Sequence, residues 1–431
     1  MNRKKIAFLT FGCKLNFAET SEVSKLFNIK NFEIVSHKDI ADIYIINSCS
    51  VTAKAESKCR QAIRHAKKIN PEAFIAVIGC YSQLKPDELE KMEGVNLVIG
   101  NDLKFKLPDF LQNPNNLDNN KTHLIDILKS DQFNPSFSAS DRTRSFLKIQ
   151  DGCDYFCSYC TIPYARGLSR SDSIENIIKS ADNISELGIK EIILTGVNIG
   201  DFGRNNNESL YELIVELNKV EAIERIRISS IEPDLLTDEI IKFVANSPKF
   251  LPHFHIPLQS GSDKILKAMN RKYEKQLFAD KISKIKTLMP ESCIAADVIV
   301  GFPGETNDDF IETYEFIKNL DISYVHVFSY SDRENAKSIH FSNKIQGKTI
   351  KDRSKKLHQL SLEKKLYFCQ QNIGRTEKVL FESNNYNDFM LGWTENYIRV
   401  KTKYNTELIN KILTVELNKF DENGVFLLEK I

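Results

Sequence analysis

The sequence predicts an α/β protein of three parts: an N-terminal doubly wound parallel sheet, a central partial (β/α)6 barrel and a small C-terminal β-barrel. Three observations support this fold class. At 431 residues the chain exceeds the length at which one hydrophobic core stops growing. Short apolar runs alternate with helical stretches over most of the chain, which is typical of parallel sheets. After about residue 371, short β-rich pieces separated by turns replace this alternation, which indicates a small barrel.

The composition is that of an ordinary globular protein, with 42% hydrophobic and 27% charged residues. There are 59 basic and 58 acidic residues, a net charge of +1, so any nucleic-acid surface must be local. No segment approaches the roughly 20 apolar residues that span a bilayer. The first residues, MNRKK, precede only a short apolar run, unlike a secretory signal. We therefore expect a cytoplasmic protein without a membrane partner.

The first part of the chain alternates expected strands with expected helices. The strands are residues 6–10, 43–47, 74–79 and 97–99, and two helices are residues 18–27 and 53–69. Residues 112–140 are rich in Asn and Ser and weakly periodic, which predicts a linker. The first domain is therefore expected to comprise residues 1–135.

A second α/β run follows and defines the expected domain 136–370. Six strands are expected, with helices between them such as 174–187 and 308–318; the strands are residues 146–150, 192–195, 225–229, 253–257, 295–300 and 324–328. Six are too few for a full barrel of eight, but they suit a partial barrel with its site at the carboxyl ends of the strands. A long helix, 350–372, then leads into the small barrel expected for residues 371–431.

The strongest chemical signal is a C-x3-C-x2-C run directly after the strand 146–150. Its members are Cys153, Cys157 and Cys160. Three thiolates on one loop can hold three irons of a 4Fe-4S cluster, whereas an electron-transfer ferredoxin closes the fourth iron with another Cys. The open iron can bind S-adenosylmethionine (SAM) through its amino and carboxylate groups. Buried thiols or a zinc site are the alternatives, but zinc prefers four ligands.

A second set of cysteines is spread over the first domain. Cys13, Cys49 and Cys80 each lie just beyond the carboxyl end of an expected strand. Because these ends converge on one crevice in a doubly wound sheet, we expect the three thiols to face one point. Taken alone, such residues could equally be core cysteines. The remaining three, Cys59, Cys293 and Cys369, are interpreted as structural.

The C-x3-C-x2-C loop resembles the signature of the radical SAM superfamily, and both cysteine sets together resemble the methylthiotransferase family. Supporting motifs are YARG at 164–167, LTGVN at 194–198, HIPLQSGS at 255–262 and DVIVGFPGET at 297–306. The resemblance covers essentially the whole chain. It implies an N-terminal domain with one 4Fe-4S cluster, a radical SAM domain with a second, SAM as cofactor, and a C-terminal TRAM domain that binds RNA.

Within that family, GCKLN at 12–16 is similar to the branch that acts on N6-threonylcarbamoyladenosine in tRNA. The isopentenyladenosine branch more often has Gln after this Cys, and the ribosomal-protein branch has Pro-Lys. CTIPYARG at 160–167 and GWTENY at 392–397 add support. One segment departs from the family pattern YSxRxGTxA: residues 330–338 read YSDRENAKS, without the Gly-Thr pair. This departure places the loop geometry of that segment in question, but not the cluster sites.

The resemblance implies conversion of N6-threonylcarbamoyladenosine at position 37 of the anticodon loop to its 2-methylthio form. SAM would be cleaved reductively at the cluster on Cys153, Cys157 and Cys160, and the cluster on Cys13, Cys49 and Cys80 would present the sulfur. The expected partners are tRNA, SAM and an electron donor such as flavodoxin or ferredoxin. The alternatives are methylthiolation of isopentenyladenosine or of a ribosomal protein, and a non-catalytic iron-sulfur sensor that binds RNA.

Eight further residues are candidates for binding SAM. By resemblance, Thr195, Gly196 and Asn198 steady its amino and carboxylate groups, although an ordinary strand-to-helix turn is the alternative. Gln259 and Ser260 follow another strand and could bind the ribose or carboxylate, while Val300 could flank the adenine. Just past the cluster loop, Arg166 and Arg170 could pair a carboxylate bidentately; solvated surface arginines are the alternative.

Two features bear on RNA binding. The expected helix over 348–365 carries seven basic residues against two acids; the basic ones are Lys348, Lys351, Arg353, Lys355, Lys356, Lys364 and Lys365. This stripe could contact phosphates or be an ordinary solvated helix. Residues 371–431 hold eight basic residues against nine acids, so their RNA role rests on the resemblance. Their aromatic residues Tyr386, Trp393 and Tyr397 could stack on bases or pack in the barrel core.

Overall fold

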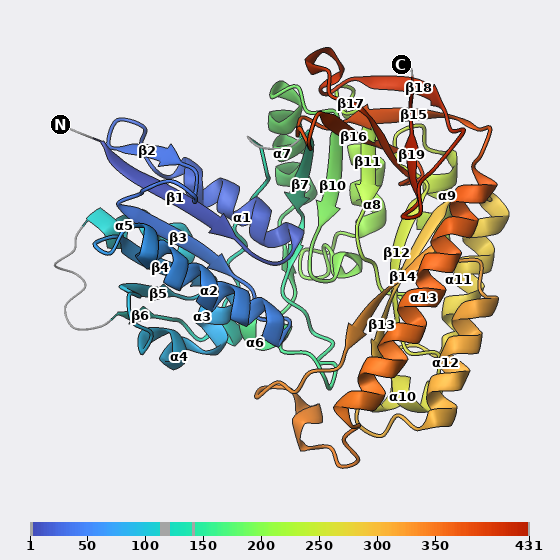
Figure 1. Cartoon of the computed structure of the whole chain (residues 1–431), viewed down its shortest axis with the longest axis horizontal. Helices are drawn as coiled ribbons and strands as arrows, with labels where there is room; N and C mark the ends of the chain where they lie inside the picture. Colours follow the sequence, from blue (N-terminus) through green and yellow to red (C-terminus); the bar gives the residue numbers. More distant parts are fainter. Residues whose placement is uncertain (1–2, 113–120, 140–142, 430–431) are drawn as a thin grey trace.

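The computed structural model describes residues 3–112, 121–139 and 143–429 (Figure 1). Its first part is a parallel sheet of six strands in the order β2-β1-β3-β4-β5-β6. The strands are β1 (Lys4–Thr10), β2 (Phe32–Val35), β3 (Ile43–Ser48), β4 (Phe74–Gly79), β5 (Leu97–Ile99) and β6 (Thr122–His123). The sequence predicted the four central strands and missed the two at the edges. β2 is only partly buried and β6 has two residues, so neither produces a clear apolar run.

Helices cover both faces of this sheet, as a doubly wound fold requires. One face packs against α2 (Ala53–Ile69) and the other against α1 (Lys14–Lys25) and α5 (Leu107–Gln112). Two short helices, α3 (Cys80–Leu84) and α4 (Pro86–Glu90), follow β4. The prediction of α2 is confirmed over its full length, whereas α1 begins four residues before the expected start. Its first turn contains the polar Lys14 and Asn16, which obscured its apolar period.

The second part is the predicted partial barrel of six parallel strands. They form two three-stranded sheets, β11-β10-β7 and β12-β13-β14, which a parallel bridge between Ser230 and His255 connects. The strands are β7 (Arg144–Lys148), β10 (Glu191–Thr195), β11 (Arg225–Ile228), β12 (His253–Gln259), β13 (Cys293–Val300) and β14 (Tyr324–Ser329). A short antiparallel pair, β8 (Gln150–Asp151) and β9 (Arg170–Ser171), flanks the cluster loop. The carboxyl ends of the barrel strands face the first sheet's domain.

Most barrel helices lie on its outer surface and have recognisable start signals, whereas α6 (Ile162–Arg166) packs against α3 of the first domain. At α7, α8, α9 and α12 a Ser or Thr side chain accepts a hydrogen bond from the backbone N–H three residues on, which satisfies one free donor of each first turn. The helices are α6 (Ile162–Arg166), α7 (Ile174–Glu186), α8 (Leu210–Leu217), α9 (Asp238–Asn246), α10 (Asp263–Ala268), α11 (Lys275–Leu288) and α12 (Asn307–Asn319).

A long helix joins the barrel to the third part of the chain. This helix, α13 (Gly347–Gln371), packs along β14 and α12, as Figure 1 shows. A five-stranded mixed sheet follows in the order β18-β15-β16-β17-β19, consistent with the predicted small barrel. Its strands are β15 (Thr376–Phe381), β16 (Phe389–Thr394), β17 (Arg399–Lys403), β18 (Ile412–Glu416) and β19 (Val425–Leu427).

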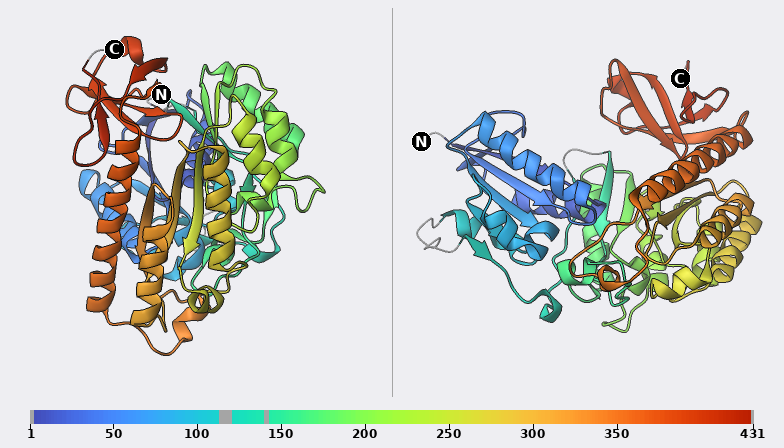
Figure 2. Two further views of the ribbon diagram at one scale, coloured as in Figure 1. Left: turned by 90° about the vertical axis from the view of Figure 1, so that its right-hand side faces the viewer. Right: turned by 60° about the horizontal axis from the view of Figure 1, so that its bottom comes forward.

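The three parts meet around one central region. Figure 2 shows the first sheet beside the barrel and the C-terminal sheet above one end of both α13 and the barrel. Residues 113–120 and 140 of the predicted linker, together with residues 141–142 after it, lie outside the described residues. No helix in the described ranges has the length and apolar character that crossing a membrane requires.

Candidate functional site

The structure brings the three scattered cysteines of the first domain to one edge of its sheet. Cys13 follows β1 and caps the start of α1, Cys49 follows β3, and Cys80 begins α3 directly after β4. Gly12, with φ of +103°, lies so close to Cys49 that a Cβ on it would come within 2.7 Å of the Cys49 Cβ. Only glycine accepts both the conformation and the close approach. The convergence expected from adjacent parallel strands is therefore observed.

The surroundings of these thiols disfavour a free thiolate. Burial, together with the neighbouring charge of Cys80, raises the pKa of the Cys49 thiol to about 12. The Asn101 side-chain amide donates to Cys80 Sγ at 3.5 Å. Thiolates in such surroundings need a positive partner, and irons supply it, so the donor set fits an iron-sulfur cluster.

The second cysteine set lies on the loop between β8 and α6. Three N–H groups point at its sulfurs: the Tyr155 backbone donates to Cys153 at 3.5 Å, the Ile162 backbone donates to Cys160 at 3.4 Å, and Arg271 Nη1 donates to Cys157 at 3.2 Å. N–H groups commonly donate hydrogen bonds to the cysteine sulfurs of such clusters, and these bonds adjust the reduction potential of the cluster. This loop therefore also fits a cluster.

Arg271 is a functional candidate that the sequence analysis missed. Its buried guanidinium bonds Cys157 and pairs with Glu232, whose pKa burial raises to about 7. Arg271 lies more than a hundred residues after the cysteine loop, in the turn after α10. No local pattern connects the two, so only the fold reveals the contact.

A buried group of charges connects the two cysteine sets. Glu19, on α1 two turns after Cys13, accepts bidentate hydrogen bonds at 3.0 Å from Arg166, which closes α6 just after Cys160. Lys104 lies 2.6 Å and Lys148 3.0 Å from the same carboxylate. The cations hold the pKa of Glu19 well below its usual range despite its burial. We call Glu19, Lys104, Lys148 and Arg166 the charge network.

The charge network extends to the residues beside the thiols. Arg166 Nη2 donates to Asn16 Oδ1 at 2.6 Å, and Asn16 is three residues from Cys13. Lys104 donates to Asn101 Oδ1 at 3.0 Å, while the amide of Asn101 reaches both Cys80 and the Ala165 carbonyl. Because the network bridges the first domain and the barrel, it fixes one cysteine set relative to the other.

The two arginines expected to pair a SAM carboxylate instead pair with carboxylates of the protein. Arg166 is fully bonded to Glu19, Asp151 and Asn16. Arg170 pairs with Asp102 at 3.1 Å and donates to backbone carbonyls. Both are buried, so the alternative of solvated surface arginines is wrong. The carboxylates that these arginines pair belong to the protein, and the sequence could not distinguish a ligand carboxylate from a distant Glu or Asp.

The other expected SAM contacts lie around the open end of the barrel. The Gln150 side-chain oxygen accepts from the backbone N–H groups of Val197 and Asn198 and orders the turn that contains Thr195 and Gly196. Asn198 Oδ1 is buried and has no partner within the described residues. Gln259, with φ of +63°, makes no side-chain hydrogen bond there either. Such free amide groups are available to a polar ligand.

Ser260 and Val300 are more enclosed. The hydroxyl of Ser260 lies 3.2 Å from that of Thr313 and accepts from the Ser262 backbone. Val300 is fully buried, and its carbonyl accepts from the Tyr330 backbone N–H at 2.9 Å. Ser260 therefore already has protein partners, and Val300 can offer only contact with its backbone or side chain.

Two cavities open beside the cysteine sets. The smaller, about 220 Å³, is lined by Cys160, Gln259 and Arg333 among others. The larger, about 500 Å³, lies where all three parts of the chain meet and is lined by Cys13, Lys14, Thr195, Gly196, Asp297 and Tyr397 among others. Asp297 lines both cavities. A volume of this size is typical of small-ligand sites.

The family models and the relatives identify the chain. A model described as the radical SAM superfamily matches residues 147–317, and one described as uncharacterized protein family UPF0004 matches residues 5–100. Threonylcarbamoyladenosine tRNA methylthiotransferase MtaB of Bacillus subtilis is 38% identical over 96% of this chain and 94% of its own length. The chain belongs to the radical SAM methylthiotransferases. Its cofactors, as predicted, are those of this family: SAM and 4Fe-4S clusters.

Further relatives agree with this assignment. The MtaB protein of Aquifex aeolicus is 39% identical over 92% of this chain and 96% of its own. The tRNA-2-methylthio-N(6)-dimethylallyladenosine synthase of Fusobacterium nucleatum is 31% identical over 96% and 97%. Among solved structures, the radical SAM methyltransferase TsrM of Kitasatospora setae has a TM-score of 0.54 at 12% identity, over 76% of this chain and 75% of its own, which shows a shared fold.

The segment of this methylthiotransferase that lacks the Gly-Thr pair is anchored to the first domain and to the cysteine loop of its own domain. Arg333 Nη1 donates to Glu56 of α2 at 2.8 Å, and Ser338 N donates to the Ser158 carbonyl at 2.8 Å. The other guanidinium nitrogens of Arg333 are buried without partners among the described residues. Arg333 lines the smaller cavity, so it is a second ligand candidate that the sequence analysis missed.

The features expected to bind RNA are only partly exposed. On α13, Arg353 bonds Glu305, while Lys364 and Lys365 donate to backbone carbonyls. The four other basic residues of α13 face solvent: Lys348, Lys351, Lys355 and Lys356.

The aromatic residues of the third part divide between its surface and the domain junction. Trp393 stacks on Tyr397 at 4.3 Å, and Tyr397 packs against His253 of the barrel, whereas Tyr386 is half exposed. Trp393 and Tyr397 thus join two parts of the chain. The three leftover cysteines, Cys59, Cys293 and Cys369, lie in hydrophobic cores.

The charge network yields a stability prediction. Glu19→Gln removes one of the two buried carboxylates that face the three cations and leaves Asp151 alone against them, so we expect it to lower the free energy of unfolding by about 3–5 kcal/mol. Glu22→Gln is the matched control, because its exposed pair with Lys25 on the same helix contributes at most about 1 kcal/mol. Urea denaturation of both variants measures the difference. Equal stability of the two would contradict a central role for Glu19.

Proposed function

We propose that this enzyme converts N6-threonylcarbamoyladenosine at position 37 of tRNA to its 2-methylthio form. The observation that supports this most directly is the pair of three-cysteine sets at the domain junction, each beside one of two cavities that share Asp297 in their walls. The relatives named for this substrate are 33–39% identical to the chain, whereas those named for dimethylallyladenosine are 30–31% identical. This difference favours threonylcarbamoyladenosine over the rival substrates.

The proposed ligands follow from the two sets. Cys153, Cys157 and Cys160 hold the cluster that works with SAM, and the first-domain set holds the other; its members are Cys13, Cys49 and Cys80. With three thiolates each, both clusters keep one iron open. When bound, the clusters and SAM supply the radical and the sulfur chemistry, while the protein binds, orients and excludes water.

The chain's own residues orient SAM at the open end of the barrel. The Thr195–Gly196–Asn198 turn, held by Gln150, offers the unpartnered Asn198 oxygen to the amino group. The free side-chain amide of Gln259 is placed for the ribose or carboxylate, and Val300 for the adenine. Ser260 has a supporting role through the loop it bonds, because its hydroxyl is already occupied.

The remaining assignments concern organisation and partners. We propose residues 1–135 as the methylthiotransferase domain, 136–370 as the radical SAM domain and 371–431 as a TRAM-like RNA-binding domain. The exposed lysines of α13 are suited to contact tRNA phosphates. An electron donor such as flavodoxin or ferredoxin would supply the reducing equivalents in the cytoplasm.

Nucleoside mass spectrometry tests the proposed substrate. We expect tRNA from cells lacking the gene to lose 2-methylthio-N6-threonylcarbamoyladenosine and to accumulate its unthiolated precursor. Restoring the gene should reverse both changes. Loss of the 2-methylthio form of isopentenyladenosine, with threonylcarbamoyladenosine products unchanged, would refute this substrate and favour the rival branch.

Single cysteine substitutions separate the two proposed clusters. Cys157→Ala should abolish formation of 5′-deoxyadenosine from SAM, because it removes a ligand of the SAM-side cluster. Cys13→Ala should leave that cleavage measurable and stop sulfur insertion into tRNA. Cys59→Ala, a substitution of a core cysteine, should retain both activities. Full methylthiolation by Cys13→Ala would refute the two-cluster arrangement.

The Arg271 contact predicts a change in reduction potential. Arg271→Met removes a charged N–H donor from the Cys157 sulfur, which disfavours the additional electron. We expect the potential of the SAM-side cluster to fall by an amount on the order of 60 mV, equivalent to about 1.4 kcal/mol for one electron. Spectroscopic redox titration measures it, with the exposed neighbour Lys272→Met as control. An unchanged potential would show that the bond does not influence the cluster.

A further inference from the structure

The larger cavity contains one positive charge that the protein leaves unmatched. Lys14 directly follows Cys13, begins α1 and lines the cavity. Within the described residues its ammonium group makes neither a hydrogen bond nor an ion pair. A lysine side chain is a cation near neutral pH, so the cavity wall holds a positive charge without a partner among these residues.

The other charged groups around this cavity have partners. Arg144 and Arg227 pair with Glu191, and Arg144 also pairs with Glu382. Asp297, the acidic residue in the wall of this cavity, is hydrogen-bonded to His255 at 2.8 Å. Lys14 is therefore the charged side chain of the cavity wall that has no hydrogen-bond or ion-pair partner among the described residues.

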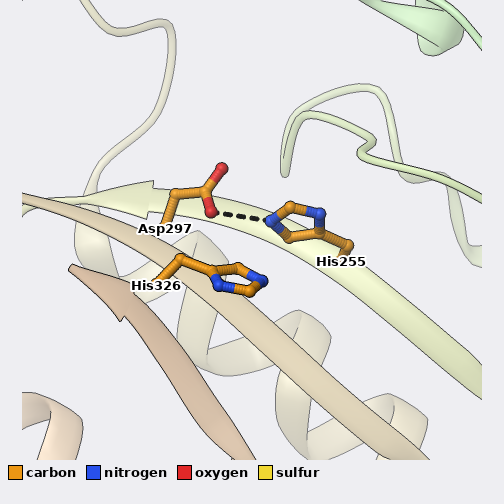
Figure 3. Close-up of side chains that lie close together, drawn as sticks. All are labelled: His255, Asp297 and His326. Carbon is orange, nitrogen blue, oxygen red and sulfur yellow. Dashed lines mark hydrogen bonds and ion pairs between the residues drawn. The ribbon is translucent and has the colours of Figure 1, made fainter. Parts of the chain in front are cut away.

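Figure 3 shows the hydrogen bond between Asp297 and His255. The carboxylate on β13 points toward the ring of His255 on β12, and His326 on β14 lies beside them. The three groups lie within 4.8 Å of one another. Burial lowers the pKa of His253 in the same wall, so this ring stays neutral. This arrangement leaves Asp297 committed to a histidine rather than to Lys14.

The rest of the cavity suits a purine base. Aromatic rings from all three parts of the chain surround it: Phe17, Phe146, Tyr324, Phe328 and Tyr397. Enzymes that modify a base within RNA stack it between such rings, and aromatic surfaces accept any base. Recognition of one particular modified base must therefore come from a polar contact to its substituent.

We propose that Lys14 binds the carboxylate of the threonylcarbamoyl group and thereby selects the modified adenosine. This inference rests on the proposed function and names the residue that gives it specificity. The substituent carries one carboxylate, and the cavity provides one unpaired cation next to the Cys13 thiol. A partly buried charged hydrogen bond of this kind is worth about tenfold in affinity.

Two other anions could reach the same ammonium group: the carboxylate of SAM and a phosphate of the tRNA backbone. Neither distinguishes threonylcarbamoyladenosine from adenosine. A test with matched RNAs therefore separates them from the proposed contact. The RNAs are anticodon stem-loops that carry N6-threonylcarbamoyladenosine, its threonyl methyl ester, or adenosine at position 37.

Fluorescence anisotropy with the reconstituted enzyme gives the affinity for each stem-loop. The wild-type enzyme should bind the free acid about tenfold more tightly than the methyl ester. Lys14→Gln and Lys14→Met should bind acid and ester equally, and Lys14→Arg should restore most of the preference. Lys25→Met, at the other end of α1, is the matched control and should keep the wild-type preference. SAM affinity should be the same for every variant.

Each contrary outcome overturns the proposal. If the wild-type enzyme binds acid and ester equally, or if Lys14→Gln keeps the preference, the carboxylate lies elsewhere. Weaker binding of all three RNAs by Lys14→Gln would indicate a phosphate contact, and weaker SAM binding a cofactor contact. The acid–ester comparison on the wild-type enzyme needs no variant to fold. Should the enzyme methylthiolate threonylcarbamoyladenosine in tRNA while Lys14→Gln keeps the preference, only the Lys14 proposal fails.

Discussion

The contact on which the rest of the site depends is the bidentate pair between Glu19 and Arg166. Both side chains are buried, and each lies two turns or less from a cysteine of a different set. Moving either domain would leave buried charges without partners, which is far more costly than losing a surface ion pair. The pair thus fixes the distance and orientation between two sites that are far apart in sequence. Reactions that use both sites on one base require this constraint.

The cysteines were predictable because their positions follow from local patterns. A strand followed by a Cys places the thiol at the carboxyl edge of a parallel sheet, and adjacent strands then bring Cys13, Cys49 and Cys80 together. The spacing of Cys153, Cys157 and Cys160 within one loop needs no tertiary information. The positions of most strands and the partial barrel were accessible for the same reason, since strongly periodic segments define them.

The polar contacts around the cysteines were not predictable from one sequence. Arg166 was expected to face a ligand, yet its partner Glu19 lies 147 residues earlier and carries no local signal. Arg271 and Arg333 likewise meet their partners only through the fold. Lys14 directly follows Cys13 in the sequence, but only the structure shows that no carboxylate of the described residues pairs with it. Edge strands β2 and β6 escaped detection because they bury little apolar surface.

The cavity connects this architecture with function because all three parts of the chain contribute to its wall. Cys13 and Lys14 come from the first domain, Thr195 and Asp297 from the barrel, and Tyr397 from the C-terminal sheet. The stack of Trp393, Tyr397 and His253 holds that sheet against the barrel, so the C-terminal part shapes the site as well as being a candidate RNA contact.

Iron and sulfide content per chain tests the central claim that each three-cysteine set holds its own cluster. After anaerobic reconstitution, the wild-type enzyme should contain about eight irons, two clusters of four. Replacing Cys13, Cys49 and Cys80 together by Ala should leave about four, as should replacing Cys153, Cys157 and Cys160. About four irons in the wild-type enzyme, or about eight in either triple variant, would contradict the account.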